Sequence, residues 1–330
     1  IIFFNANVYT FAFQITHFKA CLLLLTLVTF IGFIYIHMLW YRRRAEDWLC
    51  TSCIYSQQIN PGEYEFLSKP NINCSADPPF LVILVTTTHN QYEVRKVIRA
   101  SWGKERTIGG KRIVTFFLLG ITDNFQYQAQ VMNESKWFKD LIQQNFIDTY
   151  FNLTLKMLMG LEWVYHFCPQ SSFVMKTDTD IFVNVLYLTE LLLTKNRTSN
   201  FVTGFLKLNE APIRYRSSKW YVSKIEYPWS TYPPFCSGTG YVFSSDIAGK
   251  VFNISSKIPF LKLEDVYFGL CLSKLQITPE RLTANVVFFP EKTHFSACSL
   301  RQIVTLHQVT PYEMLLYWDW LENPSITCTE

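Results

Sequence analysis

Hydrophobic and polar positions follow one another in blocks, and these blocks predict an α/β fold. Residues 80–85 (Phe-Leu-Val-Ile-Leu-Val) form a continuous apolar run, as a strand buried on both faces requires. Residues 91–102 then place apolar side chains three and four positions apart, which indicates an amphipathic helix. Alternation of strands and helices along the chain is typical of an α/β sheet. Further strands are predicted at 114–120, 173–177, 201–206 and 303–307, and further helices at 153–167 (capped by Asn152), 187–193, 262–272 and 311–321.

The apolar run at 173–177 ends in two acids, Asp178 and Asp180. Strand side chains alternate between faces, so both acids point to the same side. Open α/β sheets bind ligands beyond the carboxyl ends of their strands, and paired carboxylates there suit Mg²⁺ or Mn²⁺. The alternative is a polar turn with solvated acids, since Glu63 and Glu65 have the same spacing in a segment that resembles a linker.

A hydroxyl-rich turn, which includes Thr86, precedes a helix that carries Arg95 and Arg99 on one side. Hydroxyls and guanidinium groups at the start of a helix suit the phosphates of a nucleotide. From spacing alone, a solvated basic helix face is an equally good interpretation.

Residues 207–240 concentrate aromatic side chains among turn-forming residues. Trp220, Tyr227 and Tyr232 offer flat apolar faces with polar tips, which suit packing against a sugar ring. The glycines Gly238 and Gly240 follow them. The alternative is an aromatic core beneath a long loop.

Two further candidates have strong structural alternatives. Glu264 and Asp265 begin a predicted helix, where acids ordinarily cap the helix or complement its dipole. His307 ends a short apolar run, where a single histidine is more often structural than a metal ligand.

The N-terminal part of the 330 residues differs from the rest. The chain is 49% hydrophobic. Residues 21–41 carry no formal charge, and this segment is long enough to cross a bilayer. We therefore expect an N-terminal tail at 1–19, a transmembrane signal-anchor at 20–41, a stem at 42–73 and a globular domain at 74–330. The charges of the chain beyond residue 44 balance, which gives no support for nucleic-acid binding.

The charges, sequons and cysteines give conflicting signals about the side of the membrane. Arg42–Arg44 would stay in the cytoplasm by the positive-inside rule. Five N-x-S/T sequons instead favour a glycosylated lumenal domain, and nine cysteines favour an oxidising compartment in which disulfides form. The pairing of the cysteines cannot be deduced from spacing. The sequons are at Asn73, Asn133, Asn152, Asn196 and Asn253.

Together, several stretches resemble the β-1,3-glycosyltransferases of glycosyltransferase family 31. The stretches that carry the resemblance are residues 95–103, 152–156, 173–184, 232–242 and 264–267. The resemblance implies a Rossmann-like GT-A domain and a single-pass type II enzyme of the Golgi membrane. It also implies UDP-galactose as donor and a divalent metal, Mn²⁺ or possibly Mg²⁺, held at Asp178, Asp180 and His307.

The resemblance further implies an inverting transfer of galactose to the 3-hydroxyl of a terminal N-acetylglucosamine or a related N-acetylhexosamine. In this mechanism Asp265 accepts the proton of the acceptor, beside Glu264. The cations Arg95, Arg99 and Lys156 would offset the charge of the leaving UDP. The alternatives are a β-1,3-N-acetylglucosaminyltransferase and a membrane-anchored glycan-binding protein without turnover. The oligomeric state stays open.

Overall fold

The computed structural model describes residues 25–38, 60 and 62–328. The chain divides into two units, residues 1–56 and residues 57–330. In the first unit, residues 25–38 are helical and most of their side chains are exposed. Within the described ranges, no helix has both the length and the hydropathy needed to span a membrane. The remainder of the predicted anchor at 20–41 and the Arg42–Arg44 run lie outside the described residues.

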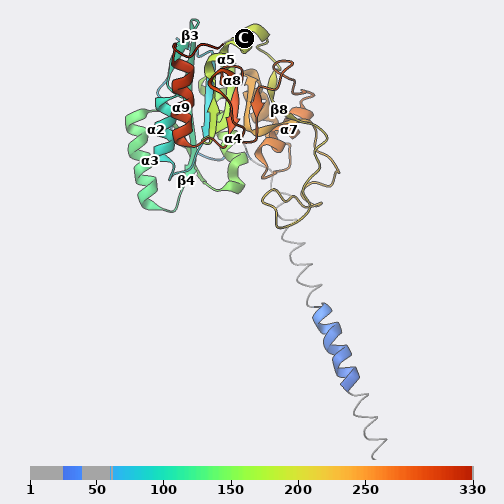
Figure 1. Cartoon of the computed structure of the whole chain (residues 1–330). Helices are drawn as coiled ribbons and strands as arrows, with labels where there is room; N and C mark the ends of the chain where they lie inside the picture. The colour runs from blue at the N-terminus through green and yellow to red at the C-terminus, as the bar shows by residue number, and fades with distance from the viewer. Residues whose placement is uncertain (1–24, 39–59, 61, 329–330) are drawn as a thin grey trace, which may run out of the picture. The chain divides into compact units, whose positions relative to one another are not determined.

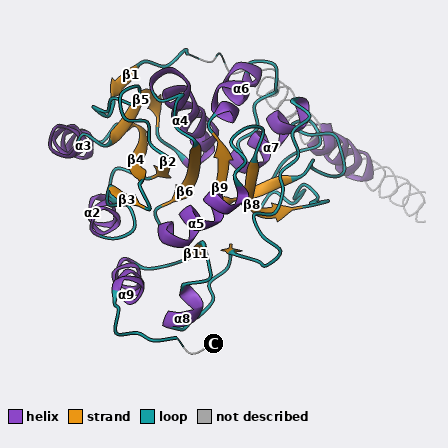
Figure 2. Ribbon diagram, turned by 90° about the horizontal axis from the view of Figure 1, so that it is seen from above, coloured by secondary structure: helices purple, strands orange, loops and turns teal. Residues whose placement is uncertain are grey.

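The second unit is built on a mixed eight-stranded sheet, which Figure 2 shows edge-on between two layers of helices. Strands β2, β4, β5 and β6 are parallel to one another, and β1, β3 and β9 pair with strands of this group antiparallel. Strand β8 pairs antiparallel with β9 and therefore runs in the same direction as β6. The main order is β1-β5-β4-β2-β6-β9-β8, with β3 paired to β4. The bounds are β1 Phe66–Ser68, β2 Leu81–Thr86, β3 Arg106–Ile108, β4 Lys111–Ile121, β5 Leu141–Ile147, β6 Phe173–Asp178, β8 Val202–Lys207 and β9 Phe235–Ser244.

Helices cover both faces of this sheet because the central strands are apolar on both sides. On β2, Val82 and Leu84 belong to one core, while Ile83 and Val85 belong to the other. The first core includes residues of α4 (Leu153–Phe167), α6 (Asp246–Ser255) and α7 (Glu264–Lys274). The second includes residues of α2 (Tyr92–Ala100), α3 (Phe125–Phe138), α5 (Val185–Lys195), α8 (Ala297–Leu300) and α9 (Pro311–Glu322). Figure 1 shows α9, in red, in front of the sheet.

A smaller three-stranded sheet lies beside the acids that follow β6. Its order is β10-β11-β7, with bounds Phe288–Phe289, Thr305–His307 and Ile181–Val183. Strand β11 is antiparallel to β7 and pairs His307 with Ile181. This register brings His307 next to Asp180, although the two residues are far apart in the sequence.

These elements confirm the predicted α/β class and most of its strands and helices. The helix predicted at 153–167 has those bounds, but the predicted capping role of Asn152 is wrong: its side chain donates to the carbonyl of Ile147 instead. Strand β5, strand β9 and helix α6 were not predicted. The segment expected as stem contains β1, which pairs with β5 at the edge of the sheet.

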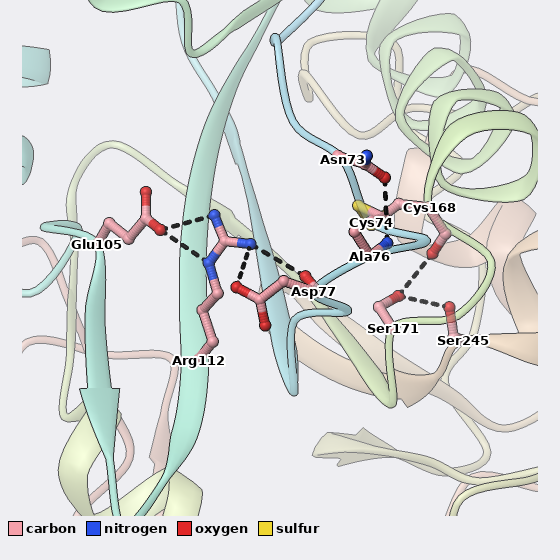
Figure 3. Close-up of a disulfide and its surroundings, with 9 residues drawn as sticks. All are labelled: Asn73, Cys74, Ala76, Asp77, Glu105, Arg112, Cys168, Ser171 and Ser245. Carbon is pink, nitrogen blue, oxygen red and sulfur yellow. Dashed lines mark hydrogen bonds and ion pairs between the residues drawn. A yellow bond between two sulfur atoms is a disulfide. The ribbon is translucent and has the colours of Figure 1, made fainter.

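Two disulfides hold loops of the second unit. Cys74–Cys168 joins the segment before β2 to the end of α4 (Figure 3), and Cys298–Cys328 joins α8 to the C-terminal segment. Cys236 and Cys271 are buried and are not disulfide-bonded. In Figure 3, Arg112 on β4 also forms ion pairs with Asp77 and Glu105. Disulfides are typical of domains that fold in an oxidising compartment.

Candidate active site

The carboxyl ends of β2 and β6 meet at the first of the candidate acids. Parallel pairing places Thr86 opposite Asp178, and the Thr86 hydroxyl donates to Oδ1 of Asp178. About a third of the Asp178 side chain is exposed, so the acid lies at the surface end of two buried strands. The structure thus brings together Thr86 and Asp178, as their expected roles require.

Lys176 lies two residues before Asp178 on β6 and points to the same face. Its Nζ is 2.9 Å from Oδ1 of Asp178 and 3.1 Å from Oε2 of Glu264. It also donates to the carbonyl of Gly238 on β9 at 2.8 Å. The side chain is almost completely buried. Burial alone would lower the pKa of Lys176, but Asp178 and Glu264 outweigh it and raise that pKa. Lys176 therefore remains a cation.

Glu264 begins α7 and is buried. Burial raises the pKa of Glu264 to about 7, with nearby Asp265 acting in the same direction and Lys176 opposing it. The hydroxyl of Tyr241 donates to Oε1 of Glu264, so both carboxylate oxygens have protein partners. Glu264 is held too firmly for free rotation toward a substrate.

Asp265 lies beside Glu264 but is held by backbone groups. Its Oδ2 accepts from the amide of Gly238 at 3.0 Å and its Oδ1 accepts from the amide of Val266 at 2.8 Å. Burial raises the pKa of Asp265, while these two amides oppose the rise. A Cβ on Gly238 would lie 3.4 Å from carboxylate oxygens of both Asp265 and Glu264. Glycine therefore allows β9 to approach the two acids closely.

Asp180 and His307 form a second pair at the same edge. Oδ2 of Asp180 is 3.2 Å from Nε2 of His307, and Nδ1 of His307 is 2.7 Å from the carbonyl of Pro290. The hydrogen bond to Asp180 raises the pKa of His307. Burial would raise the pKa of Asp180, but His307 outweighs it and lowers that pKa.

The Asp180–His307 pair fits a metal ion in one respect. A metal-binding histidine ordinarily donates its other ring N–H to a carbonyl or carboxylate, and Pro290 provides that carbonyl. A carboxylate and an imidazole are suitable donors for Mn²⁺ or Mg²⁺. Among the described residues, however, no three His, Cys, Asp or Glu side chains are grouped closely enough to hold a metal. Asp178, the third expected ligand, contacts Lys176 instead.

The cations expected to bind phosphate have other partners. Arg95 is completely buried, and its guanidinium donates to both carboxylate oxygens of Glu134. Arg99 pairs with Glu134 and with Asp140. Burial alone would raise the pKa of Glu134, but the two arginines lower it. The guanidinium of Arg95 therefore has its hydrogen bonds inside the domain, whereas Nη1 of Arg99 has no partner among the described residues.

Lys156 on α4 is also buried, and its Nζ lies 2.7 Å from Oδ1 of Asp148. It donates to the carbonyl of Thr87 at 2.6 Å. Burial lowers the pKa of Lys156, and Asp148 opposes that effect. Arg95, Arg99 and Lys156 thus have protein partners beneath the β2–α2 turn, and their predicted contact with the diphosphate stays a prediction.

The aromatic segment 207–234 forms a loop that Arg214 holds together. Its guanidinium donates to the carbonyls of Val222, Tyr227 and Trp229. The rings of Tyr227 and Tyr232 are 4.9 Å apart. Both tyrosines are buried, whereas about half of Trp220 is exposed. The two tyrosines fit the interpretation as an aromatic core beneath a loop, whereas the exposed Trp220 could pack against a sugar ring.

Tyr232, in this loop, and Tyr150, outside it, both interact electrostatically with Asp265. Within the described part of the chain, the buried hydroxyl of Tyr232 has no hydrogen-bond partner, and Asp265 contributes to its raised pKa. Tyr150 begins η1 (Tyr150–Asn152). Burial and then Asp265 raise the pKa of Tyr150, whereas a hydrogen bond with Trp220 lowers it. Sequence reasoning missed Tyr150, because nothing near it in the chain indicates its distant neighbours.

The five sequons lie on the outside of the domain. Four of their asparagines are exposed and one, Asn152, is half-buried. The exposed positions are accessible to a glycan, whereas the amide of Asn152 donates to the carbonyl of Ile147, and modification of all five stays a prediction. The four exposed asparagines are Asn73, Asn133, Asn196 and Asn253.

The sequence is similar to known galactosyltransferases. Residues 93–283 match the family model described as Galactosyltransferase. The chain is 57% identical over 258 residues to β-1,3-galactosyltransferase 5 of Homo sapiens, covering 78% of this chain and 83% of that protein. It is 46% identical over 269 residues to β-1,3-galactosyltransferase 1 of Mus musculus, covering 81% of each.

Similarity to solved structures is weaker. A bifunctional glycosyltransferase, WbbM, aligns at a TM-score of 0.38 and 12% identity, covering 76% of this chain and 50% of that one. A score this low adds nothing to the assignment. The sequence matches span the strands and helices that carry Asp178, Asp180 and Asp265, and on that basis the chain belongs to the galactosyltransferase family.

Proposed function

We propose that the chain transfers galactose from UDP-galactose, with inversion, to the 3-hydroxyl of a terminal N-acetylglucosamine or related N-acetylhexosamine on a glycoprotein or glycolipid. The observation that carries this proposal is the position of Asp265, held by two backbone amides and connected through Gly238 and Lys176 to Asp178. Family membership implies a sugar-nucleotide donor and a glycan acceptor. The names of the relatives support galactose and the β-1,3 linkage.

In the proposed reaction Asp265 accepts the proton of the acceptor hydroxyl as that oxygen attacks the anomeric carbon. A bond forms between the acceptor oxygen and the anomeric carbon, and the bond to the diphosphate oxygen breaks. Because attack and departure occur on opposite sides, the configuration inverts. A general base works best when its pKa lies near the working pH, and burial raises the pKa of Asp265 in that direction.

The local charge supports a divalent cation, Mn²⁺ or Mg²⁺. Asp178 and Glu264 share the ammonium of Lys176, Asp180 pairs with His307, and Asp265 accepts from the amide of Gly238, so carboxylates outnumber the cations in contact with them. Asp180 and His307 would hold the ion, and Asp178 would face it from the end of β6. A bound ion supplies charge stabilisation for the leaving UDP.

The GT-A assignment and the Golgi location are part of the same proposal. The parallel strands at the centre of the mixed sheet, with Asp178 at the carboxyl end of β6, support the former. The two disulfides support an oxidising lumen reached through a signal-anchor at 20–41. If the domain is lumenal, the full-length protein from mammalian cells should migrate faster after glycosidase treatment. An unchanged band beside a control that shifts would favour a cytoplasmic domain.

A donor and acceptor panel tests the function. The purified full-length chain is supplied with UDP-galactose, UDP-N-acetylglucosamine and UDP-glucose, each with a β-glycoside of N-acetylglucosamine. We expect transfer from UDP-galactose, and loss of transfer in excess EDTA that Mn²⁺ restores. Transfer from UDP-N-acetylglucosamine alone would favour the N-acetylglucosaminyltransferase alternative. Glycan binding without any transfer would favour a lectin-like role.

A further inference from the structure

Lys176 is the only described residue whose side chain contacts both the acid at the end of β6 and the start of α7. Its three ammonium contacts reach Asp178, Glu264 and the carbonyl of Gly238. An ammonium carries three donors, and these three acceptors use all of them. The side chain is 5% exposed, so water does not compete for these contacts.

The contact with Gly238 leads directly to the proposed base. The carbonyl of Gly238 accepts from Lys176, and the amide of the same residue donates to Oδ2 of Asp265. Lys176 thus holds the peptide plane that follows the Cα of Gly238, and Asp265 accepts from the plane that precedes it, so the two contacts meet at one residue. Glycine has no side chain to fix it, and a Cβ there would be 3.4 Å from Oδ2 of Asp265.

The contact with Glu264 constrains Asp265 from its other side. Glu264 precedes Asp265 at the start of α7, and Lys176 and Tyr241 hold its two carboxylate oxygens. The first turn of α7 is thus tied to β6 through Lys176 and to β9 through Tyr241. Lys176 also contacts Asp178, two residues further along β6. The same side chain therefore contacts the acid proposed to face the donor and holds the groups next to Asp265, the proposed base.

We propose that Lys176 is a positioning residue that holds Asp265 in place for proton transfer by fixing Gly238 and Glu264. This inference rests on the proposed role of Asp265. Burial raises the pKa of Asp265, and the positive charge of Lys176 opposes that rise together with the amides of Gly238 and Val266. In the proposed reaction Lys176 contacts neither sugar. Its replacement should therefore lower kcat without changing which sugars react.

The test compares Lys176→Met with a matched variant, Lys156→Met, in the full-length chain. Lys156 is equally buried and paired, but its partners are Asp148 and Thr87. Both changes leave a buried carboxylate without its cation, and both should lower the melting temperature. Only Lys176→Met should lower kcat per folded molecule, by about 10- to 100-fold, as expected when a catalytic group is displaced by about 1 Å.

Binding of UDP with Mn²⁺, measured by calorimetry, gives the second readout. Removing a cation beside Asp178 cannot weaken metal binding electrostatically, so Lys176→Met should bind UDP–Mn²⁺ at least as tightly as wild type. The acid limb of its pH–rate profile should move to higher pH, because a carboxylate without a nearby cation has a higher pKa. A purely structural lysine would move neither the profile nor kcat per folded molecule.

Two further variants keep the test decisive if Lys176→Met fails to fold. Lys176→Met with Glu264→Gln removes both charges of the pair and should recover stability while kcat stays low. Lys176→Arg keeps the charge and should retain the wild-type pH limb. Normal kcat in the double variant, or parallel loss of UDP–Mn²⁺ binding and turnover, would overturn the proposal. If wild type uses another UDP-sugar, the same assays with that donor test Lys176 separately from the galactose assignment.

Discussion

The ammonium of Lys176 lies 3.1 Å from Oε2 of Glu264, and both side chains are almost completely buried. One residue comes from the strand that ends in Asp178 and the other from the helix that carries Asp265. Replacing one member of a buried ion pair is costly because the remaining charge has no partner. The contact therefore couples the stability of the domain to the geometry of the site.

The first prediction concerns pH and Glu264. Because burial raises the pKa of Glu264 to about 7 from 4.5, the folded state binds a proton more tightly than the unfolded state. Stability should fall as pH rises from about 4.5 to about 7, by on the order of 2–3 kcal/mol from this residue. Glutamine at this position cannot ionise, so between about pH 4.5 and pH 7 the unfolding free energy of Glu264→Gln should rise relative to that of wild type by this amount.

Denaturant unfolding at several pH values measures this difference. Glu93→Gln, at an exposed position on α2, is the control and should follow wild type. A difference between Glu264→Gln and wild type that does not vary with pH would show that Glu264 is ionised throughout the range.

The second prediction concerns His307. If it supports a metal with Asp180, His307→Ala should weaken Mn²⁺ binding about 10- to 100-fold, as loss of a ligand or its support commonly does. Mn²⁺ titration in the presence of UDP, followed by electron paramagnetic resonance, measures this without turnover. His294→Ala, at an exposed histidine, is the control. Equal Mn²⁺ affinity in both variants would leave His307 with a structural role only.

The third prediction separates structure from phosphate binding at Arg95. Arg95→Met leaves Glu134 with one fewer cation in the interior, and should destabilise the domain by about 3–5 kcal/mol. UDP affinity per folded molecule should be unchanged. Thermal unfolding and calorimetry on the same preparation give both values. A stable variant that no longer binds UDP would restore the phosphate-binding role suggested by the sequence.

The sequence predicts elements whose pattern is purely apolar or periodic, such as β2 and α4. It fails at β5, because Gln143 and Gln144 resemble surface positions although both are buried. Their amides are satisfied by Gly120 and Glu162, and no local pattern predicts such partners. It also fails at β9, where Gly238 and its neighbours suggest a loop. Glycine is needed there for close approach to the acids, not for a turn.

The sequence also suggests individual site residues only where a local pattern or a family resemblance points to them. Asp178 and Asp180 became candidates because an apolar run ends at them, and Asp265 only through family resemblance; their roles stay predictions. For Arg95 the sequence shows the charge but not its partner Glu134, which comes from another helix. Lys176 lies inside the motif yet was passed over, since burial beside three acceptors is a property of the fold alone.

Turnover of Asp265→Asn, together with identification of the wild-type product, tests the proposed function most directly. Nuclear magnetic resonance of the wild-type product from UDP-galactose and an N-acetylglucosamine β-glycoside should show a β-1,3 linkage. An amide cannot accept the acceptor proton, so Asp265→Asn should lose about 10²- to 10⁴-fold in kcat, with UDP–Mn²⁺ binding retained and only a small decrease in melting temperature. Near-normal turnover of this variant, or a product with another linkage, would contradict the account.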